Sequence, residues 1–241
     1  MTVASSPERA LEPSEVGIFR PSARPLTSIA LAAVTFVVLL VVGLALRPGQ
    51  DAGLARDFNS LHTGVVGAFT SAVYEIFSPV PAIVVTVLVA AVFWRTRGFR
   101  TAMAFGGVVA LTWLPTEVLK IVVHRHRPTL MPHPYYPVQV DSSFPSGHTA
   151  FIVAFVLALA YVGRGARWRN LVVALGSLVV VVVALSIAID AVHFPSDIAA
   201  SIVWSLAVAP AARVVWVDWI MPRVPLLAAP TLPESTERSL D

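Results

Sequence analysis

The sequence predicts an all-α, polytopic membrane protein whose core is a bundle of six transmembrane helices. Of its 241 residues, 56% are hydrophobic and only 13% are charged, whereas a soluble domain carries about 25% charged residues. The mean hydropathy is +0.77. Apolar runs of about 20 residues, the length that crosses a bilayer as a helix, are spread throughout the chain. This distribution favours a single membrane domain.

The N-terminal part is predicted to contain a tail, a first span and a surface helix. Residues 1–25 are polar and contain four prolines, a composition that predicts a disordered cytoplasmic tail. The first apolar run, about residues 26–46, is longer than the roughly 7–15 residues of a signal-peptide core, so it is predicted to be an uncleaved span. Apolar residues at helical spacing over 61–77 predict an amphipathic helix in the membrane interface.

Five further apolar runs follow, separated by polar segments. Prolines stand in the first turn of the second run, where a helix tolerates them, and five prolines stiffen the longest internal loop, residues 124–146. The runs cover about residues 78–94, 101–123, 146–163, 171–192 and 197–217. The six-span domain is therefore predicted over residues 26–219, with a polar C-terminal tail over residues 220–241.

Charge distribution predicts the topology. Six spans place both ends of the chain on one side of the membrane, together with two arginine-rich loops, residues 95–100 and 164–169. The positive-inside rule assigns that side to the cytoplasm. Arginines clustered in short loops fit topology better than nucleic-acid binding, and the net charge of +3 is small. The chain has no cysteine, which excludes disulfides, zinc–thiolate sites and iron–sulfur clusters.

Three polar segments, residues 120–128, 145–148 and 193–197, stand where apolar runs end or begin. They contain the patterns Lys-x6-Arg-Pro, Pro-Ser-Gly-His and His-x3-Asp. In the predicted topology all three face the extracytoplasmic side of the cell membrane. The patterns and the arginine loops are independent observations, so their agreement supports one extracytoplasmic site.

The first segment suits phosphate binding. Seven residues of α-helix turn through about 700°, which places Lys120 and Arg127 on one face, and His124 joins them if the helix continues. An arginine fork and a lysine point charge are both good phosphate ligands. A structural alternative pairs Lys120 with Glu117, three residues earlier, and uses Arg125 and Arg127 as lipid-headgroup anchors.

The second segment opens an apolar helix at Ser146. The free N–H groups of a helix start bind anions, Gly147 lets a phosphate approach the backbone closely, and the Ser146 hydroxyl adds a donor. His148 titrates near neutral pH and suits a general acid that protonates a leaving alkoxide. The alternative is a serine cap followed by an interfacial histidine.

The third segment places His193 four residues before Asp197. A carboxylate can hold an imidazole in one tautomer and stabilise its cationic form, the logic of catalytic triads with histidine as the nucleophile. The alternative is a histidine and an aspartate that cap two span ends.

Together, the three segments in this order resemble the type-2 phosphatidic acid phosphatase family, membrane phosphatases that share a catalytic core with vanadium haloperoxidases. The resemblance covers roughly residues 115–200. It implies that His193 attacks phosphorus to form a phosphohistidine, that Asp197 orients it, and that His148 protonates the leaving group and then activates water. The phosphate would be held by Lys120, Arg127, Ser146 and Gly147. No metal or other cofactor is expected, because protein cations supply the electrostatic stabilisation.

One position departs from the family pattern. The third motif of the family reads Ser-Arg-x5-His-x3-Asp, whereas Ile187 follows Ser186 here, so one phosphate-binding cation is missing. Asp190 is an unexpected charge in an apolar run; it is either a carboxylate near the surface or one that pairs with a basic residue inside the bundle. Possible auxiliary residues are Arg125, as the preferred substitute donor, His124 and Asp190.

The sequence therefore predicts an integral membrane lipid-phosphate phosphatase. Candidate substrates are a polyprenyl pyrophosphate, phosphatidylglycerol phosphate or phosphatidic acid. The alternatives are a weak or inactive relative that binds lipid phosphates, given Ile187, and a small transporter, given charged residues inside a span. Membrane lipids and the lipid substrate are the expected partners, and the sequence leaves the oligomeric state open.

Overall fold

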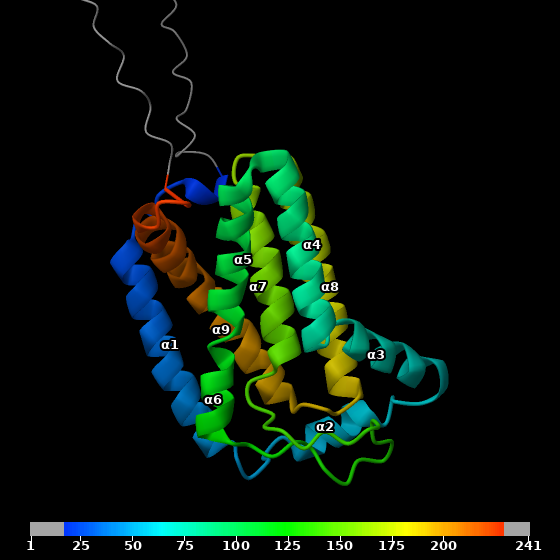
Figure 1. Cartoon of the computed structure of the whole chain (residues 1–241). Coiled ribbons are helices and arrows are strands. Elements are labelled where there is room, and N and C mark those ends of the chain that lie inside the picture. The colour runs from blue at the N-terminus through cyan, green and yellow to red at the C-terminus, as the bar shows by residue number, and fades with distance from the viewer. Residues whose placement is uncertain (1–16, 229–241) are drawn as a thin grey trace, which may run out of the picture.

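The structure, a computed structural model, describes residues 17–228 and is all-helical, without a β-strand in that range (Figure 1). A 3-10 turn at Gly17–Phe19 precedes the first helix, and a π-helix (Val214–Ile220) and a 3-10 turn (Met221–Arg223) follow the last. The α-helices are α1 (Pro25–Ala45), α2 (Ala52–Asn59), α3 (Gly64–Ile76), α4 (Pro79–Arg97), α5 (Phe99–Trp113), α6 (Thr116–Val123), α7 (Gly147–Val162), α8 (Trp168–Ile189) and α9 (Pro195–Arg213).

The predicted class, a polytopic helical membrane protein, is confirmed, but the spans are not all full-length. Within the described residues, five helical stretches are long and apolar enough to cross a membrane: α1, α4, α5 with α6, α8, and α9 with the turns that follow it. The remaining predicted span is α7, which is apolar but has 16 residues. At 1.5 Å per residue it is about 24 Å long, shorter than a hydrocarbon core of about 30 Å.

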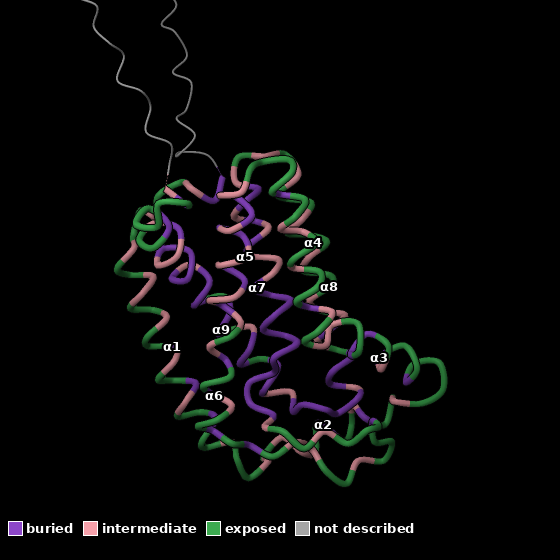
Figure 2. The backbone as a smooth tube through the Cα atoms, viewed as in Figure 1, coloured by how far each residue is buried: buried purple, intermediate pink, exposed green. Residues whose placement is uncertain are grey.

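Helix α7 lies at the centre of the bundle. It packs against α5, α8 and α9, and Figure 2 shows α7 and α9 largely buried while α1, α4 and α8 expose their outer faces. A helix that is apolar on every face is stable only where every face meets protein or lipid. The central position of α7 meets this condition, and it places the first turn of α7 among the other helices.

The predicted span over residues 101–123 is broken into two helices. Pro115 lacks a backbone N–H, so the helix is interrupted between α5 and α6. The end of α6 also differs from the expectation: His124 adopts a left-handed conformation, with φ of 46°, so the helix does not continue to Arg127. Arg47 stabilises this end by donating to the carbonyls of Val122 and Val123.

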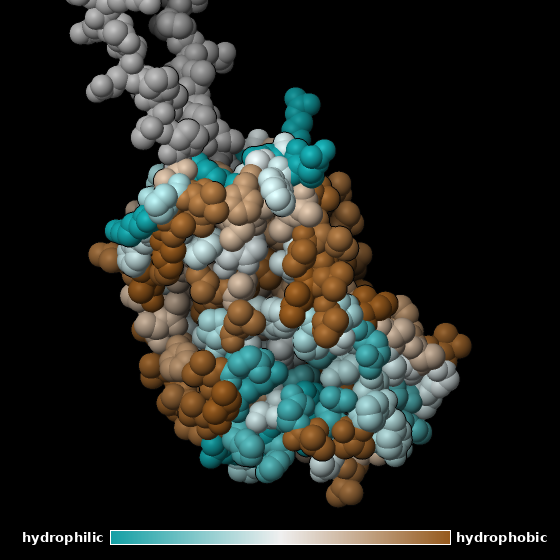
Figure 3. Space-filling view, viewed as in Figure 1, coloured by the Kyte–Doolittle hydropathy of each residue, from teal (hydrophilic) through white to brown (hydrophobic). Residues whose placement is uncertain are grey.

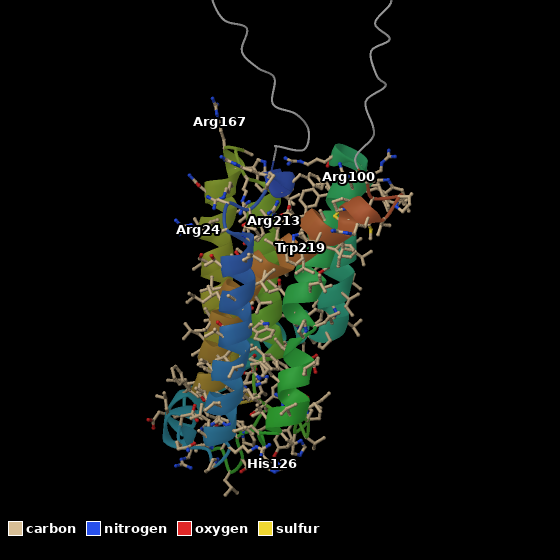
Figure 4. All side chains as sticks on the ribbon, turned by 90° about the vertical axis from the view of Figure 1, so that its left-hand side faces the viewer. Arg24, Arg100, His126, Arg167, Arg213 and Trp219 are labelled. Carbon is tan, nitrogen blue, oxygen red and sulfur yellow. The ribbon has the colours of Figure 1, made fainter. Side chains whose placement is uncertain are left out.

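The two ends of the bundle have different composition. Both described chain ends lie at one end with the loops that contain residues 95–100 and 164–169, while α2, α3 and loop 124–146 lie at the other (Figure 1). Figure 4 shows Arg24, Arg100, Arg167 and Arg213 at the first end and His126 at the second. This arrangement matches the predicted grouping of loops; assignment of the first end to the cytoplasm stays a prediction. Figure 3 shows a mainly hydrophobic belt between two more hydrophilic ends.

Parts of both predicted tails pack on the bundle. Within the predicted N-terminal tail, Ile18 is buried, and the buried guanidinium of Arg213 donates to the carbonyls of Ile18 and Arg20. In the predicted C-terminal tail, the carbonyl of Leu227 accepts a hydrogen bond from Arg100. Residues 17–25 and 220–228 therefore pack on the bundle. The rest of both predicted tails lies outside the described residues.

The predicted surface helix corresponds to α3. Val65, Phe69 and Ile76 are exposed, whereas Thr70 and Val73 are buried and the helix packs on α8. The helix is thus two-faced, as its spacing predicts, and its inner face forms one wall of the end of the bundle that carries the polar segments.

Introduced cysteines test the orientation, because the native chain has no thiol of its own. Val140→Cys lies on loop 124–146, at a position 95% exposed, and Thr96→Cys lies in the exposed last turn of α4. We expect a membrane-impermeant maleimide to label Val140→Cys in intact cells and Thr96→Cys only after permeabilisation. Labelling of Thr96→Cys alone in intact cells contradicts the topology.

Candidate active site

Two of the three polar segments, residues 120–128 and 145–148, line one pocket of about 150 Å³ at the α2–α3 end of the bundle. His193 of the third segment is buried next to it, with Nε2 3.3 Å from Nη1 of Arg127. Residues far apart in sequence reach it from α3, α6, loop 124–146 and the start of α7. Its charged and polar lining consists of Tyr74, Glu117, Lys120, Arg127, Gln139, Asp141, Gly147 and His148. Of the predicted phosphate-binding residues, Lys120, Arg127 and Gly147 are therefore brought together.

The start of α7 is shaped for this convergence. Ser146 caps the helix, since its hydroxyl accepts hydrogen bonds from the backbone N–H and the hydroxyl of Thr149. A Cβ on Gly147 would lie 3.2 Å from Nζ of Lys120. Glycine therefore allows the lysine to lie against the helix start, where the free N–H groups favour an anion.

The hydrogen bond of His193 determines its tautomer. Nδ1 lies 2.7 Å from the carbonyl oxygen of Ser143, which only accepts, so Nδ1 carries the proton. Nε2 is then unprotonated and accepts from Nη1 of Arg127 at 3.3 Å. Burial, and then the charges of Arg127 and Lys120, hold the pKa of His193 well below its usual value. The ring is therefore neutral near pH 7, and the lone pair of Nε2 faces Arg127.

Asp197 lies beside His193 but does not form its hydrogen bond. Oδ2 of Asp197 lies 3.7 Å from Nδ1 of His193 and accepts from the backbone N–H of Phe194 at 2.9 Å. Because His193 is neutral, this contact is no ion pair in the resting site. It would stabilise positive charge that develops on the ring. The direct orienting group, the backbone carbonyl of Ser143, could not be found from residue types.

His148 stacks on an aromatic side chain that the sequence analysis missed. Its ring lies 4.3 Å from that of Tyr74, at 25° to it, and 6.4 Å from that of His193. Nε2 of His148 is buried and has no hydrogen-bond partner among the described residues. The stack holds the imidazole plane, so Tyr74 on α3 orients His148 at the pocket wall. Only helical spacing on α3 hints at this role.

Both pocket cations are paired with carboxylates. Arg127 forms a fork with Asp141, with Nε–Oδ1 and Nη2–Oδ2 distances of 2.8 and 3.0 Å, and also donates to the carbonyl of Val192. Lys120 lies 3.1 Å from Glu117, the pair considered as the structural alternative. Asp141 stands just before the second polar segment, and its type alone did not indicate a contact with Arg127.

Arg125 does not line the pocket. It is fully buried, with Nη1 donating to Oδ1 of Asp197 at 2.6 Å and to Ser196, and Nη2 donating to Asp51. Its guanidinium also lies 3.9 Å from the ring centroid of Phe194. The structure thus places the preferred substitute donor behind Asp197 rather than at the phosphate pocket. His124, the other basic auxiliary candidate, is exposed beside Ser142.

Asp190 and Ile187 lie in the protein interior. Ile187 is fully buried in the apolar core. Asp190 is also buried, and its partner is His62, at 3.4 Å, rather than Lys120, Arg125 or Arg127. Burial raises the pKa of Asp190 to about 6. In the described part of the chain, Lys120 and Arg127 are therefore the two cations that line the pocket.

Comparison with known proteins places this geometry in a family. The model of the PAP2 superfamily matches residues 101–221. The fold is similar to that of the first transmembrane PAP2-type phosphatidylglycerolphosphate phosphatase from Bacillus subtilis, with a TM-score of 0.65 and 18% identity over 78% of this chain and 95% of that chain. A search of curated proteins finds no significant match. At this identity the structural likeness concerns the fold.

Arg125→Gln tests whether Arg125 acts behind Asp197. The variant leaves two carboxylates without their cation, and breaking a buried pair costs about 3–5 kcal/mol. We expect a lower Tm in detergent and a lower kcat, with Arg125→Lys intermediate because a point charge cannot bridge both carboxylates. Arg56→Gln, on the exposed face of α2, is the matched control. An unchanged Tm with a raised KM would instead indicate direct contact with the phosphate.

Proposed function

This chain belongs to the PAP2 superfamily, and from that premise we propose that it is an integral membrane lipid-phosphate phosphatase. The observation that carries the proposal is the neutral His193, whose hydrogen bond to Ser143 leaves Nε2 unprotonated beside Arg127. A nucleophile needs a free lone pair and a fixed direction. Both are supplied here by the fold, next to two cations that suit a phosphate.

The proposed first step is attack of Nε2 of His193 on phosphorus. The N–P bond forms as the bond between phosphorus and the lipid oxygen breaks. His148 takes the proton of the bound phosphate monoanion and gives it to that oxygen. The phosphohistidine ring carries positive charge, which Asp197 at 3.7 Å stabilises. Arg127 gives up its contact with Nε2 and turns its donors to the phosphate oxygens, together with Lys120.

The proposed second step releases phosphate. His148, now neutral, takes a proton from a water molecule as the oxygen of that water bonds to phosphorus and the N–P bond breaks. His148 then passes this proton to the leaving phosphate. Neutral His193 and neutral His148 are thereby restored, and inorganic phosphate leaves. The free N–H groups at the start of α7 stabilise the oxygens during both steps. In this scheme the protein cations supply the electrostatic stabilisation, and no metal is required.

The proposed substrates are phosphates of membrane lipids. A polyprenyl pyrophosphate, phosphatidylglycerol phosphate and phosphatidic acid each carry their phosphate at the membrane surface, the level expected of a pocket at the end of a helical bundle. The similar structure is that of a phosphatidylglycerolphosphate phosphatase, which supports including that lipid in the panel. The second candidate, a lipid-phosphate binding protein without turnover, is favoured by one observation: the pocket has two cations, both already paired.

His193→Ala distinguishes turnover from binding. We expect phosphate release from detergent-solubilised lipid phosphates to fall by several orders of magnitude, because a covalent nucleophile is removed. His148→Ala should slow departure of the lipid alcohol most. His126→Ala, which changes an exposed histidine on loop 124–146, is the control. More than roughly a tenth of wild-type activity in His193→Ala would exclude the nucleophilic role.

Metal independence is tested by dialysis against a chelator. Because Lys120 and Arg127 are proposed to stabilise the phosphate charge, we expect kcat/KM in excess EDTA to equal the untreated value, and added Mg²⁺ to have no effect. Loss of activity in EDTA that Mg²⁺ restores contradicts this part of the proposal.

A further inference from the structure

The catalytic pocket carries its own counter-charges. Two cations, Lys120 and Arg127, share the pocket with two carboxylates, Glu117 and Asp141, and each cation forms an ion pair with one of them. The formal charges of the four side chains cancel. A pocket built only to hold a phosphate dianion would carry excess positive charge, so the two carboxylates require an explanation.

Both carboxylates stay near the phosphate position. Glu117 lies on α6 one turn before Lys120, so the helix keeps its backbone next to that lysine. Asp141 is ionised at neutral pH: burial alone would raise its pKa, but the hydrogen bonds and charge of Arg127 outweigh burial and lower the pKa. The side chains are 54% and 55% exposed, respectively, which places both at the mouth of the pocket rather than in its wall.

A plain phosphate monoester fits this arrangement poorly. To bind Lys120 and Arg127 it must displace both carboxylates, which then lie unpaired beside a phosphate with up to two negative charges. Like charges at such distances repel. Ile187, where the family pattern has an arginine, is buried in the apolar core and supplies no further positive charge to offset the repulsion.

We propose that the pocket selects lipid phosphates that carry an ammonium group beside the phosphate ester, with Glu117 and Asp141 as the residues that recognise the ammonium. This inference rests on the proposed phosphatase function. A zwitterionic headgroup exchanges partners with the two resident ion pairs: the phosphate takes Lys120 and Arg127, and the ammonium takes the two carboxylates. With a phosphate monoanion the charges then sum to zero, and with a dianion one negative charge remains, against two for a substrate without the ammonium.

The aromatic lining of the pocket supports this substrate class. Tyr74, Phe77 and Trp113 line the same pocket as the four charged residues. Aromatic faces attract cations, ammonium groups included, and they offer nothing comparable to a phosphate. Carboxylates and aromatic rings together form an environment for an organic cation, next to two cations that take its phosphate.

A matched pair of substrates tests the proposal. A sphingoid-base 1-phosphate has an ammonium on the carbon next to the one that bears the phosphate. Its N-acetyl derivative keeps the chain and the phosphate but loses that charge. In EDTA, we expect the kcat/KM of the wild type to be roughly 10-fold higher for the free amine than for the N-acetyl derivative. This is the size expected of two half-exposed charge contacts.

Variants assign the preference to the carboxylates. Glu117→Gln and Asp141→Asn should each reduce the preference for the amine, and the double variant should abolish it, mainly by improving the N-acetyl substrate. Asp57→Asn, an exposed carboxylate on α2 at the same end of the bundle, should keep the wild-type preference. The affinities of His193→Ala for the two substrates are compared as well, so the preference is measured even where turnover is slow.

Three results would overturn the proposal. The first is equal use of the two substrates by the wild type. The second is an Asp141→Asn variant that gains equally on both substrates, which would make the carboxylate a simple gate. The third is an effect of Mg²⁺ that raises the rate of hydrolysis of the N-acetyl substrate to that of the amine. This would assign the carboxylates to a metal ion. Hydrolysis of either substrate that depends on His193 leaves the phosphatase function standing in each case.

Discussion

The buried guanidinium of Arg125 is the contact on which the rest of the site depends. It joins Asp197 at the start of α9 to Asp51 in the connection between α1 and α2. Its own backbone carbonyl accepts from the N–H of Ser143, and the carbonyl of Ser143 in turn orients His193. One residue therefore ties together the N-terminal connection, the long loop and His193. A buried charge pair of this kind tolerates little displacement, because either partner alone would be an uncompensated charge.

This arrangement separates two tasks that residue types alone do not distinguish. Arg125 and Arg127 are two positions apart, and both are arginines near a predicted phosphate site. The left-handed residue His124 ends α6 just before them, and the loop that follows has no regular secondary structure. In a regular strand two residues at this spacing would share one face, whereas here Arg125 points inward to Asp197 and Arg127 lines the pocket. The first provides a fixed frame, and the second is available to a ligand.

The short helix α7 explains how the loop and the helix ends reach one another. Its 16 residues start at the pocket, among longer neighbours, and its central position brings Ser146, Gly147 and His148 against α6 and α9. Tyr74, from α3, completes the wall by stacking on His148. The pocket is therefore assembled from the ends of several elements, and the core of apolar side chains beneath it keeps those ends in register.

The sequence by itself determined the membrane class, the approximate limits of the helices and the three polar segments, because hydrophobic length and motif order are local properties of the chain. It also predicted that Lys120, Arg127, Gly147 and His148 would meet. It did not foresee the break at Pro115 or the early end of α6, since proline and a left-handed residue act through backbone geometry.

Only the tertiary structure decided which charges meet which. The pairing of Arg125 with Asp197 and Asp51, of Asp141 with Arg127, and of Asp190 with His62 joins residues that are 14 to 128 positions apart in the chain, and no local pattern encodes such contacts. The orienting group of His193 is a backbone carbonyl, which every residue carries. Electrostatic partners depend on distances in space, and those exist only after the helices have packed.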